Sequence, residues 1–231
     1  MKRFYKQVAT VAGPDGWGIT LDGRPVKTPA RNALMLPNAA LAEAVAAEWD
    51  AQGETIDPRS MPMTGLANAA IDRVAPDPAR FAKDIAVYAE TDLTCYRADE
   101  PEDLVARQAE QWDALLDWAR TRYDVHFEIA TGIIHKAQPE ATVARLADAV
   151  AVRDPFALAA LSPLTTISGS LVAALAVLEG AIDAEAAFAT THLDELWQAE
   201  QWGEDYLAAE ARERRRQDFT AAARFAALAA G

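Results

Sequence analysis

The hydrophobic and polar positions change their period after the first part of the chain. At the N-terminus, "KRFYKQVATVA" and "WGITL" alternate between apolar and polar residues, which is typical of strands with one buried face. The stretch "GPDG" (Gly13–Gly16) predicts a turn, and Asp22-Gly23 predicts a two-residue hairpin loop. Pro25 and Pro29 interrupt the next stretch, which favours short edge strands. This first part therefore predicts a small antiparallel unit built from hairpins.

A helix is predicted directly after this unit. Asn38 is a suitable N-cap, and Leu41, Val45 and Trp49 follow at spacings of four, up to an end near Gly53. We expect this helix to pack across one face of the sheet. Trp49 is assigned to the core, because it is in register with the other two apolar residues.

Nearly every segment after the Pro-rich link "IDPRSMPMT" predicts a helix. The stretch from Ser162 to Gly180 is apolar nearly all round, which predicts one central buried helix. Another helix is predicted to begin at the cap Asp183 and to end at Gly203. Between residues 123 and 135 the pattern allows either a short strand pair or an irregular crossover.

These patterns predict an α+β fold with two domains. The N-terminal domain, residues 1–58, is a small antiparallel β-hairpin unit with a packed helix. The C-terminal domain, residues 59–231, is larger and all-α. With 231 residues, 51% of them hydrophobic, the chain is long enough to bury a proper core.

The charge limits the classes of partner. The formal net charge of −13 disfavours nucleic acid, because an acidic protein gains little from contact with phosphates. The basic run "RERRR" (Arg212–Arg216) is interleaved with acidic residues and predicts a solvated helix surface. The longest apolar run, "LVAALAVL", is far shorter than the ~18–20 residues that span a bilayer. No secretory signal is recognisable at the N-terminus, so we expect a soluble cytoplasmic protein without membrane insertion.

Candidate chemistry is sparse. Cys95 is the only cysteine, and it is either a nucleophile or, as we favour, a small buried hydrophobe. Asp92 either orients a thiolate or, as we favour, caps a loop. The three histidines, His126, His135 and His192, lack the spacing of a metal site, and no phosphate-binding loop is present. We therefore expect no metal, no cofactor and no enzyme, with a small acidic enzyme using Asp92 and Cys95 as the alternative.

The stretch "HLDELWQAEQWGED" carries the most unusual composition. A helical wheel places Asp194 and Gln201 in water, and it places Glu200 inside the apolar side. Glu200 should therefore pair with an arginine or lie at a fraying helix end. The core side of the wheel is formed by Phe188, Ala189, Leu193, Leu196, Trp197 and Ala199.

Glu195, Gln198 and Trp202 form a separate strip on one shoulder of this helix, spaced i, i+3, i+7. An aromatic residue beside a carboxylate and an amide is typical of a protein-recognition surface. A structural interpretation stands equally beside it. Trp202 then caps the helix end against the next helix, and Glu195 makes an internal salt bridge.

Several motifs together resemble one known family. "RFYK", "LDGRPVKTPA", "EWDAQG", "MPMTGLAN", "DLTCYRA", "QWDALLDWA" and "HLDELWQAEQWG" occur in the order found in the assembly chaperone of the F-type ATP synthase headpiece. The resemblance covers nearly the whole chain. It is most distinctive at Leu193, Glu195, Gln198, Trp202 and Gly203, and in the motif Glu48, Trp49, Asp50 and Gln52.

The resemblance implies a small α+β domain followed by an orthogonal helical domain. It also implies an ATP-independent chaperone that binds the unassembled alpha subunit of the ATP synthase and prevents its aggregation. Glu195 matches a functionally important glutamate of the family, and Gln198 and Trp202 are expected to contact the client with it. Mitochondrial members carry a presequence that this sequence does not show, which favours a bacterial member. A general holdase without a dedicated client is the second alternative.

Overall fold

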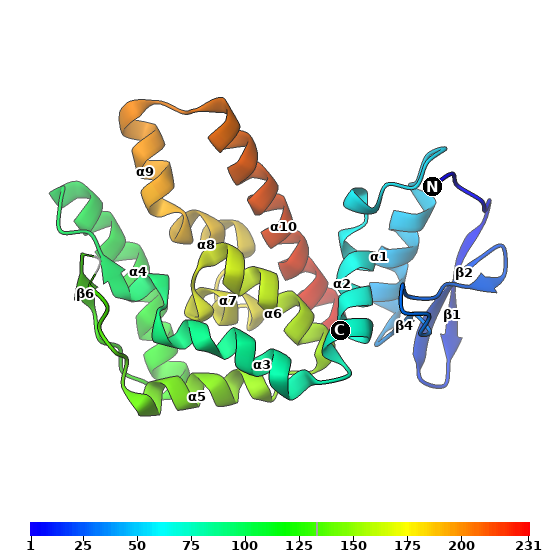
Figure 1. The fold of residues 1–231 in the computed structure, drawn as a ribbon, viewed down its shortest axis with the longest axis horizontal. Helices are drawn as coiled ribbons and strands as arrows, with labels where there is room; N and C mark the ends of the chain where they lie inside the picture. The colour runs from blue at the N-terminus through cyan, green and yellow to red at the C-terminus, as the bar shows by residue number, and fades with distance from the viewer. Residues whose placement is uncertain (133) are drawn as a thin grey trace. The chain divides into compact units, whose positions relative to one another are not determined.

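The structure is a computed structural model that describes residues 1–132 and 134–231 (Figure 1). Internal contacts divide the chain into two compact units. The first comprises Met1–Pro78, Asp154–Ala160 and Ala221–Gly231, and the second comprises Ala79–Arg153 and Leu161–Thr220. The predicted α+β class with a mostly helical C-terminal part is confirmed. The predicted division into domains 1–58 and 59–231 stays a prediction.

A small antiparallel sheet forms the N-terminal part of the first unit. Its strands are β1 (Val8–Gly13), β2 (Gly16–Leu21), β3 (Arg24–Pro25) and β4 (Met35–Leu36). β2 pairs with each of the other three. The predicted hairpin loop is confirmed, because Leu21 pairs with Arg24 and both loop residues have positive φ, 49° at Asp22 and 77° at Gly23. Gly23 adopts this conformation without the steric cost of a Cβ atom.

The helix α1 (Ala39–Asp50) packs on β1 and β2, as predicted. The side chain of Asn38 caps it by accepting a hydrogen bond from the amide of Leu41 at 2.9 Å. Its amide nitrogen also donates to the carbonyl of Leu228, at 2.8 Å, so one residue caps α1 and binds the C-terminal helix. After α1 come the short helices η1 (Pro58–Ser60), α2 (Pro62–Ala69) and η2 (Ala70–Val74).

Trp49 is less buried than the sequence predicted. Leu41 and Val45 are fully buried, but Trp49 is only partly buried, against a cluster that includes Tyr5, Leu21 and Ile56. Its ring meets that of Tyr5 edge-on, with centroids 5.8 Å apart. The predicted assignment of Trp49 to the core is therefore only partly correct, because its side chain packs against the core but keeps some exposure to solvent. The N-terminal segment covers one side of the indole, which the helical period of α1 could not show.

The second unit is built from helices. In chain order the helices that contribute to it are α3 (Pro78–Ala86), η3 (Val87–Glu90), η4 (Leu93–Cys95), α4 (Glu102–Tyr123), α5 (Glu140–Ala151), α6 (Pro155–Ser168), α7 (Leu171–Leu178), α8 (Ala184–Thr191), α9 (Leu193–Trp202) and α10 (Tyr206–Ala230). α6 and α10 also contribute residues to the first unit. α7 is the central helix, since each of its first six residues is buried and it contacts α4 and α8.

The helix boundaries around α6 differ from the prediction. Pro163 does not begin a helix but lies inside α6, and the chain breaks at Gly169 instead. Gly169 has a φ of 67°, which glycine adopts without strain, and the side chain of Ser170 caps the new helix α7. A Ser-Pro pair resembles a helix start in sequence, but the packing of this unit keeps the helix continuous through it.

The predicted helix from Asp183 to Gly203 is also divided. Asp183 caps α8 as expected, with its carboxylate 2.9 Å from the amide of Ala186. A break at His192 then separates α8 from α9, and Gly203 follows the end of α9. This break shifts the helical phase, so Ala189, predicted to face the core, is exposed.

A short strand pair lies between the helices of this unit. β5 (Tyr96–Arg97) and β6 (Ala130–Thr131) pair in parallel. The residues between 123 and 135 therefore contribute one strand to a pair whose partner comes from earlier in the chain. Residue 133 of this predicted region lies outside the described residues.

Candidate protein-binding surface

α9 carries the strip predicted to bind a partner, and α4 holds its buried side. Trp197 is buried, and its indole nitrogen donates a hydrogen bond to Asp103 at the start of α4, at 3.2 Å. Asp194 was predicted to lie in water, but it is half-buried and accepts a hydrogen bond from the side chain of Gln108 at 2.7 Å. The helical wheel could not predict this hydrogen bond, because Gln108 belongs to α4, which is distant in sequence from α9.

Glu200 has the arginine partner that the sequence predicted. Its carboxylate lies 2.8 Å from Nη1 of Arg107 on α4. Both side chains are about half exposed, so the pair lies at the surface and not on the apolar side of the helix.

Glu195 makes two ion pairs with α10, which confirms the internal salt bridge that the structural interpretation predicted. Its Oε2 lies 2.6 Å from Nη2 of Arg215, and its Oε1 lies 3.3 Å from Nη1 of Arg212. The Glu195 side chain is 35% exposed, whereas that of Arg212 is only 14% exposed. Arg212 also pairs with Glu204 in the connection between α9 and α10. Glu195 is therefore held in one orientation with part of its carboxylate open to solvent.

Trp202 does not cap α9 against the next helix. It is 75% exposed, and its ring contacts that of Trp197 edge-on, with centroids 5.7 Å apart. Tyr206 and Leu207, at the start of α10, are 77% and 70% exposed. We call Trp202, Tyr206 and Leu207 the aromatic tip. Gln198 is also exposed, and its side chain makes no hydrogen bond within the described part of the chain.

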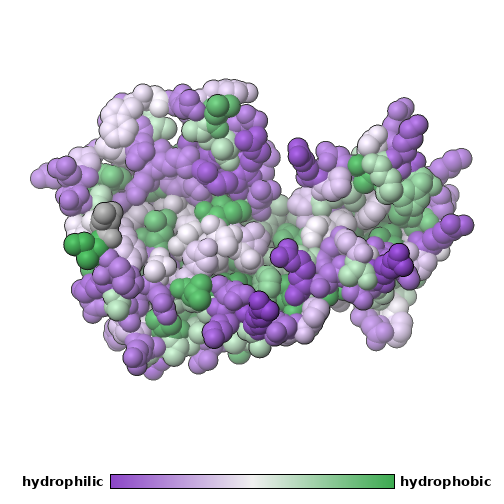
Figure 2. Space-filling view, in the orientation of Figure 1, coloured by the Kyte–Doolittle hydropathy of each residue, from purple (hydrophilic) through white to green (hydrophobic). Residues whose placement is uncertain are grey.

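A hollow of about 360 Å³ accompanies this surface where α8, α9 and α10 meet. Its apolar lining includes Phe188, Leu196 and Ala209, and its rim includes Arg212 and Arg216. In Figure 2 hydrophobic side chains lie at the start of α10, and pale and hydrophilic ones lie along the connection from α9. The surface thus combines exposed apolar groups, a hollow and fixed charges.

The basic run of α10 is neutralised within the fold. Besides the pairs made by Arg212 and Arg215, Arg214 pairs with Glu210 at 2.8 Å. Arg216 pairs with Glu213 at 2.7 Å and also with Glu185 of α8. The run is thus a network of ion pairs rather than a simple solvated surface. The sequence signalled charge there, but it did not show that two of the arginines bind Glu195.

His192 lies directly before α9 and is buried. Its ring stacks on that of Phe188, with centroids 3.8 Å apart, and its Nδ1 lies 3.0 Å from the carbonyl oxygen of Phe188. Burial lowers the pKa of His192, and the nearby positive charges of Arg215 and Arg212 act in the same direction. A neutral imidazole therefore belongs to the folded state.

Cys95 and Asp92 both have structural roles in the second unit. Cys95 is 1% exposed, and burial together with the charge of Asp92 raises the pKa of its thiol to about 12. Asp92 is fully buried, and its carboxylate accepts hydrogen bonds from Ser170 at 2.7 Å and from the amide of Val172 at 2.9 Å. It also accepts from Thr94, so it caps both η4 and α7. The predicted capping role of Asp92 and the predicted burial of Cys95 are confirmed.

Glu48, in the N-terminal motif, also caps a helix. Its carboxylate accepts hydrogen bonds from the amides of Met63 and Thr64, at 2.6 and 2.8 Å, at the start of α2.

Within the described residues, no group of three or more His, Cys, Asp or Glu side chains is placed to hold a metal ion. In that same part of the chain, no helix has the length and apolar character needed to cross a bilayer.

The comparison with known proteins identifies the class. The crystal structure of Atp12 from Paracoccus denitrificans matches 99% of this chain and 98% of its own, with 43% identity and a TM-score of 0.95. A point mutant of the same P. denitrificans protein matches with the same identity and TM-score, over 99% and 97% of the two chains. The mitochondrial protein atp12 of Schizosaccharomyces pombe is 26% identical over 219 residues, which are 87% of this chain and 74% of that protein.

These likenesses define a chaperone of ATP synthase assembly. A profile of the ATP12 chaperone protein family matches residues 2–120, and the chain belongs to this family. The matched residues include the motif around Trp49, whereas Glu195, Gln198 and Trp202 lie beyond them.

Proposed function

We propose that this chain binds the unassembled alpha subunit of the F-type ATP synthase and prevents its aggregation without using ATP. The observation that supports this most directly is the exposed aromatic tip on the same pair of helices, α9 and α10, that fixes the carboxylate of Glu195. Trp202, Tyr206 and Leu207 each expose at least 70% of their surface. Large side chains exposed within such a short stretch of the chain are a liability for a protein that has no partner, and exposed apolar patches commonly mark a protein-binding site.

The aromatic tip supplies the apolar part of the interaction. A tryptophan and a tyrosine offer large contact areas with few rotatable bonds, which makes them frequent anchors of protein interfaces. The adjacent hollow, floored by Phe188 and Leu196, is suited to receive an apolar side chain of the client. An alpha subunit without its neighbours exposes surface of this kind, and such surface drives aggregation.

Glu195 and Gln198 supply the polar part. Because Arg212 and Arg215 hold Glu195, its carboxylate is preorganised and loses little entropy when a client binds. Gln198 lies one turn further along α9 and offers both a donor and an acceptor. These groups orient the client, while the aromatic tip provides most of the contact area.

Release of the client requires no hydrolysis in this proposal. When the beta subunit competes for the same surface of the alpha subunit, mass action displaces the chaperone. The net charge of −13 keeps the free chaperone soluble and speeds encounter with any basic patch on the client. A cytoplasmic site of action is part of the same proposal.

The test mixes the purified chain with recombinant ATP synthase alpha subunit and separates the products by size exclusion. We expect a discrete complex for wild type, and loss of that complex for Glu195→Lys. Glu200→Lys is the matched control, since it makes the same charge change on the same helix at an exposed pair. A wild-type chain that leaves the alpha subunit aggregating as it does alone would overturn the proposal.

A general holdase is the first competing function. It predicts that unrelated aggregating proteins, such as thermally unfolded citrate synthase, are protected as well as the alpha subunit and without a defined stoichiometry. The fixed orientation of Glu195 favours a dedicated client, because a surface that adapts to many clients uses flexible side chains. Equal protection of both proteins at equal concentration would favour the holdase.

A small acidic enzyme is the second competing function. Its best candidates were Cys95 and Asp92, but a thiol with a pKa of about 12 is not ionised near neutral pH and is a poor nucleophile. The carboxylate of Asp92 is fully occupied by groups of the protein itself. Cys95 and Asp92 therefore have structural roles rather than catalytic ones. The variant Cys95→Ala should bind the alpha subunit as well as wild type does.

A further inference from the structure

The first unit contains a groove that the proposed function does not use. Its volume is about 680 Å³, and one wall is formed by Met1 and Phe4 of the N-terminal segment. The other wall is formed by Arg24–Lys27, which includes the edge strand β3. Tyr5, Leu21, Asp22 and Trp49 complete the lining. Three of them, Tyr5, Leu21 and Trp49, belong with Val26 to one apolar cluster. The groove is therefore apolar at its base.

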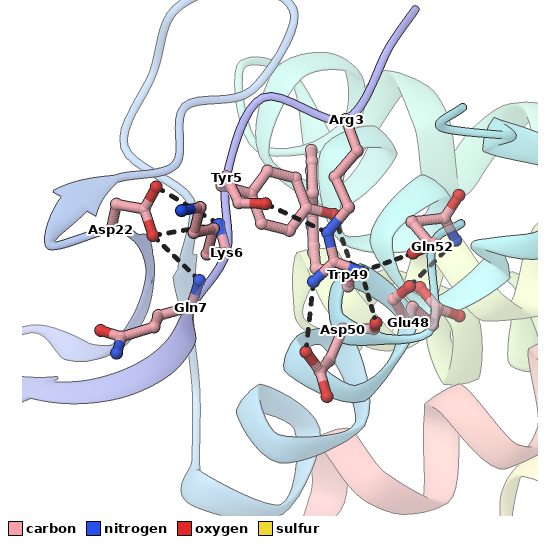
Figure 3. Close-up of polar contacts among 9 residues, drawn as sticks. All are labelled: Arg3, Tyr5, Lys6, Gln7, Asp22, Glu48, Trp49, Asp50 and Gln52. Carbon is pink, nitrogen blue, oxygen red and sulfur yellow. Dashed lines mark hydrogen bonds and ion pairs between the residues drawn. The ribbon is translucent and has the colours of Figure 1, made fainter. Parts of the chain in front are cut away.

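Several contacts hold the N-terminal wall in place, as Figure 3 shows. The hydroxyl of Tyr5 donates a hydrogen bond to the carbonyl of Trp49 at 2.6 Å. The guanidinium of Arg3 lies 4.6 Å from the centre of the Tyr5 ring, and its Nη1 donates to the carbonyl of Asp50 at 3.0 Å. The amide of Arg3 donates to the carbonyl of Glu54 at 2.8 Å. The groove is thus a built feature and not the gap beside a loose chain end.

Large apolar side chains remain exposed at the edge of this groove. Phe4 is 64% exposed and Met1 is 74% exposed. The ring of Phe4 meets the buried ring of Tyr5 edge-on, with centroids 5.3 Å apart, so the exposed side chain continues the apolar base. In Figure 2 hydrophobic side chains gather on the first unit close to the first residues of the chain, with hydrophilic ones around them. An exposed phenylalanine beside an apolar groove is a suitable contact for an inserted side chain.

Two basic side chains that line the groove are available to a partner. Arg24 and Lys27 are exposed, and neither makes an ion pair or side-chain hydrogen bond within residues 1–132 and 134–231. Arg3, in contrast, is bound by Asp50. The acidic residue of the lining, Asp22, accepts hydrogen bonds from the amides of Lys6 and Gln7, at 2.9–3.3 Å. These backbone hydrogen bonds lower the pKa of Asp22, and the charges of Lys6 and Arg24 act in the same direction to a smaller degree. Neither Arg24 nor Lys27 is held by an ion pair within the described residues, so carboxylates of a partner can pair with both.

The charge of this region is opposite to that of the whole protein. Residues 1–36 contain six Lys or Arg and two Asp, whereas the full chain has a net charge of −13. The positive charge therefore gathers in the segment that forms most of the groove. Such a local reversal of sign steers a partner segment of complementary charge to one place on an otherwise acidic protein.

We propose that this groove binds an extended segment of the client that presents a bulky apolar side chain flanked by carboxylates. The apolar side chain lies against Phe4, Tyr5 and Trp49, and the carboxylates pair with Arg24 and Lys27. This inference rests on the proposed function, because the partner is the same client, and it adds a second contact surface on the first unit. Anionic lipid or nucleic acid would also meet the cations, but the total charge of the protein opposes a long polyanionic surface.

The first experiment measures the affinity of the full-length chain for recombinant ATP synthase alpha subunit. Arg24→Glu together with Lys27→Glu reverses both cations of the groove, and Arg59→Glu together with Arg73→Glu makes the same charge change at exposed arginines outside its lining. We expect the first pair to weaken binding about tenfold or more and the second pair to change it less than about threefold. Phe4→Ala tests the apolar contact separately at an exposed position, where folding is not at risk.

The second experiment identifies the segment. Phe4 is replaced by photoreactive benzoylphenylalanine, and the complex with the alpha subunit is irradiated and digested. We expect a crosslinked alpha-subunit peptide in which an apolar residue is flanked by Asp or Glu. The same amino acid at Val152, which is 79% exposed in the second unit, is the control and should give a different peptide or none.

The outcomes separate this inference from the function on which it rests. If wild type fails to bind the alpha subunit, the proposed function falls and this inference falls with it. If wild type binds and both double variants bind alike, the function stands and the groove is not a contact surface. A crosslink to a basic segment, or binding of the groove to phosphatidylglycerol vesicles that competes with the alpha subunit, would overturn the proposed occupant.

Discussion

Oε2 of Glu195 lies 2.6 Å from Nη2 of Arg215, and this ion pair joins α9 to α10. The residues are 20 positions apart, on two helices with an exposed connection between them. The pair therefore has two roles in our proposal. It fixes the two helices that carry the aromatic tip, and it orients a carboxylate that a client can reach.

The role of Glu195 in folding is smaller than its proposed role in binding. Its side chain is partly exposed, so Glu195→Gln should lower the free energy of unfolding by only about 1 kcal/mol. The same variant should weaken binding of the alpha subunit about tenfold, because it removes a preorganised charge. Urea unfolding and titration calorimetry measure the two effects. A large loss of stability with unchanged affinity for the client would show that the ion pairs are only structural.

Two tryptophans of α9 provide a direct contrast. Trp202→Ala should leave thermal unfolding nearly unchanged, because Trp202 is 75% exposed, but it should reduce binding of the alpha subunit by about 2 kcal/mol or more. Trp197→Ala removes a buried side chain and should cost about 3–5 kcal/mol of stability. If Trp202→Ala binds the client like wild type, the aromatic tip is not an anchor.

Trp49 should contribute less to stability than its size suggests. It is partly buried, so we expect Trp49→Ala to cost about 2 kcal/mol, compared with about 3–5 kcal/mol for Trp112→Ala, where the indole is 1% exposed. Chemical denaturation followed by circular dichroism compares the two. Trp49→Arg tests the assignment to the core, which predicts unfolding of the N-terminal region. Normal stability of that variant with weakened client binding would instead place Trp49 in the groove contact.

The buried His192 predicts a pH dependence of stability. Burial lowers its pKa below the ordinary value of 6.5, so the unfolded chain binds a proton there more readily than the folded chain. The contribution of His192 is therefore complete above about pH 6.5 and is lost as the pH falls through the lower pKa of the folded state. We expect the free energy of unfolding to decrease between about pH 7.5 and about pH 5. His192→Gln should show a smaller decrease, and an identical decrease would remove His192 as its source.

Gly169 and Gly65 should respond in opposite directions to alanine. Gly169 has a φ of 67° at the break between α6 and α7, so Gly169→Ala should cost about 1 kcal/mol or more. Gly65 lies inside α2. Apart from its two chain neighbours and the backbone of its own helix, no atom of the described residues lies within 4 Å of the place that a Cβ atom would take, so Gly65→Ala should stabilise the protein by about 0.5–1 kcal/mol. Melting temperatures of the two variants test this directly. Stabilisation by Gly169→Ala would contradict the positive φ of Gly169 at the break between α6 and α7.

Local signals determined much of the fold from sequence alone. The hairpin at Asp22-Gly23, the cap of α1 at Asn38 and the cap of α8 at Asp183 were predicted correctly, since each depends on interactions between near neighbours in the chain. The amphipathic periods predicted most helices for the same reason. The burial of Cys95 and the capping role of Asp92 also followed from residue type and context.

Only the tertiary structure decided the features that depend on distant partners. It placed the helix breaks at Gly169 and His192 rather than at Pro163, because packing of the whole unit selects among several acceptable boundaries. The sequence by itself marked Glu195 and Trp202 as unusual. It could not show that α10 holds the carboxylate while leaving the indole in solvent, because helical periodicity describes one helix and contains no information about which distant side chains fold against it.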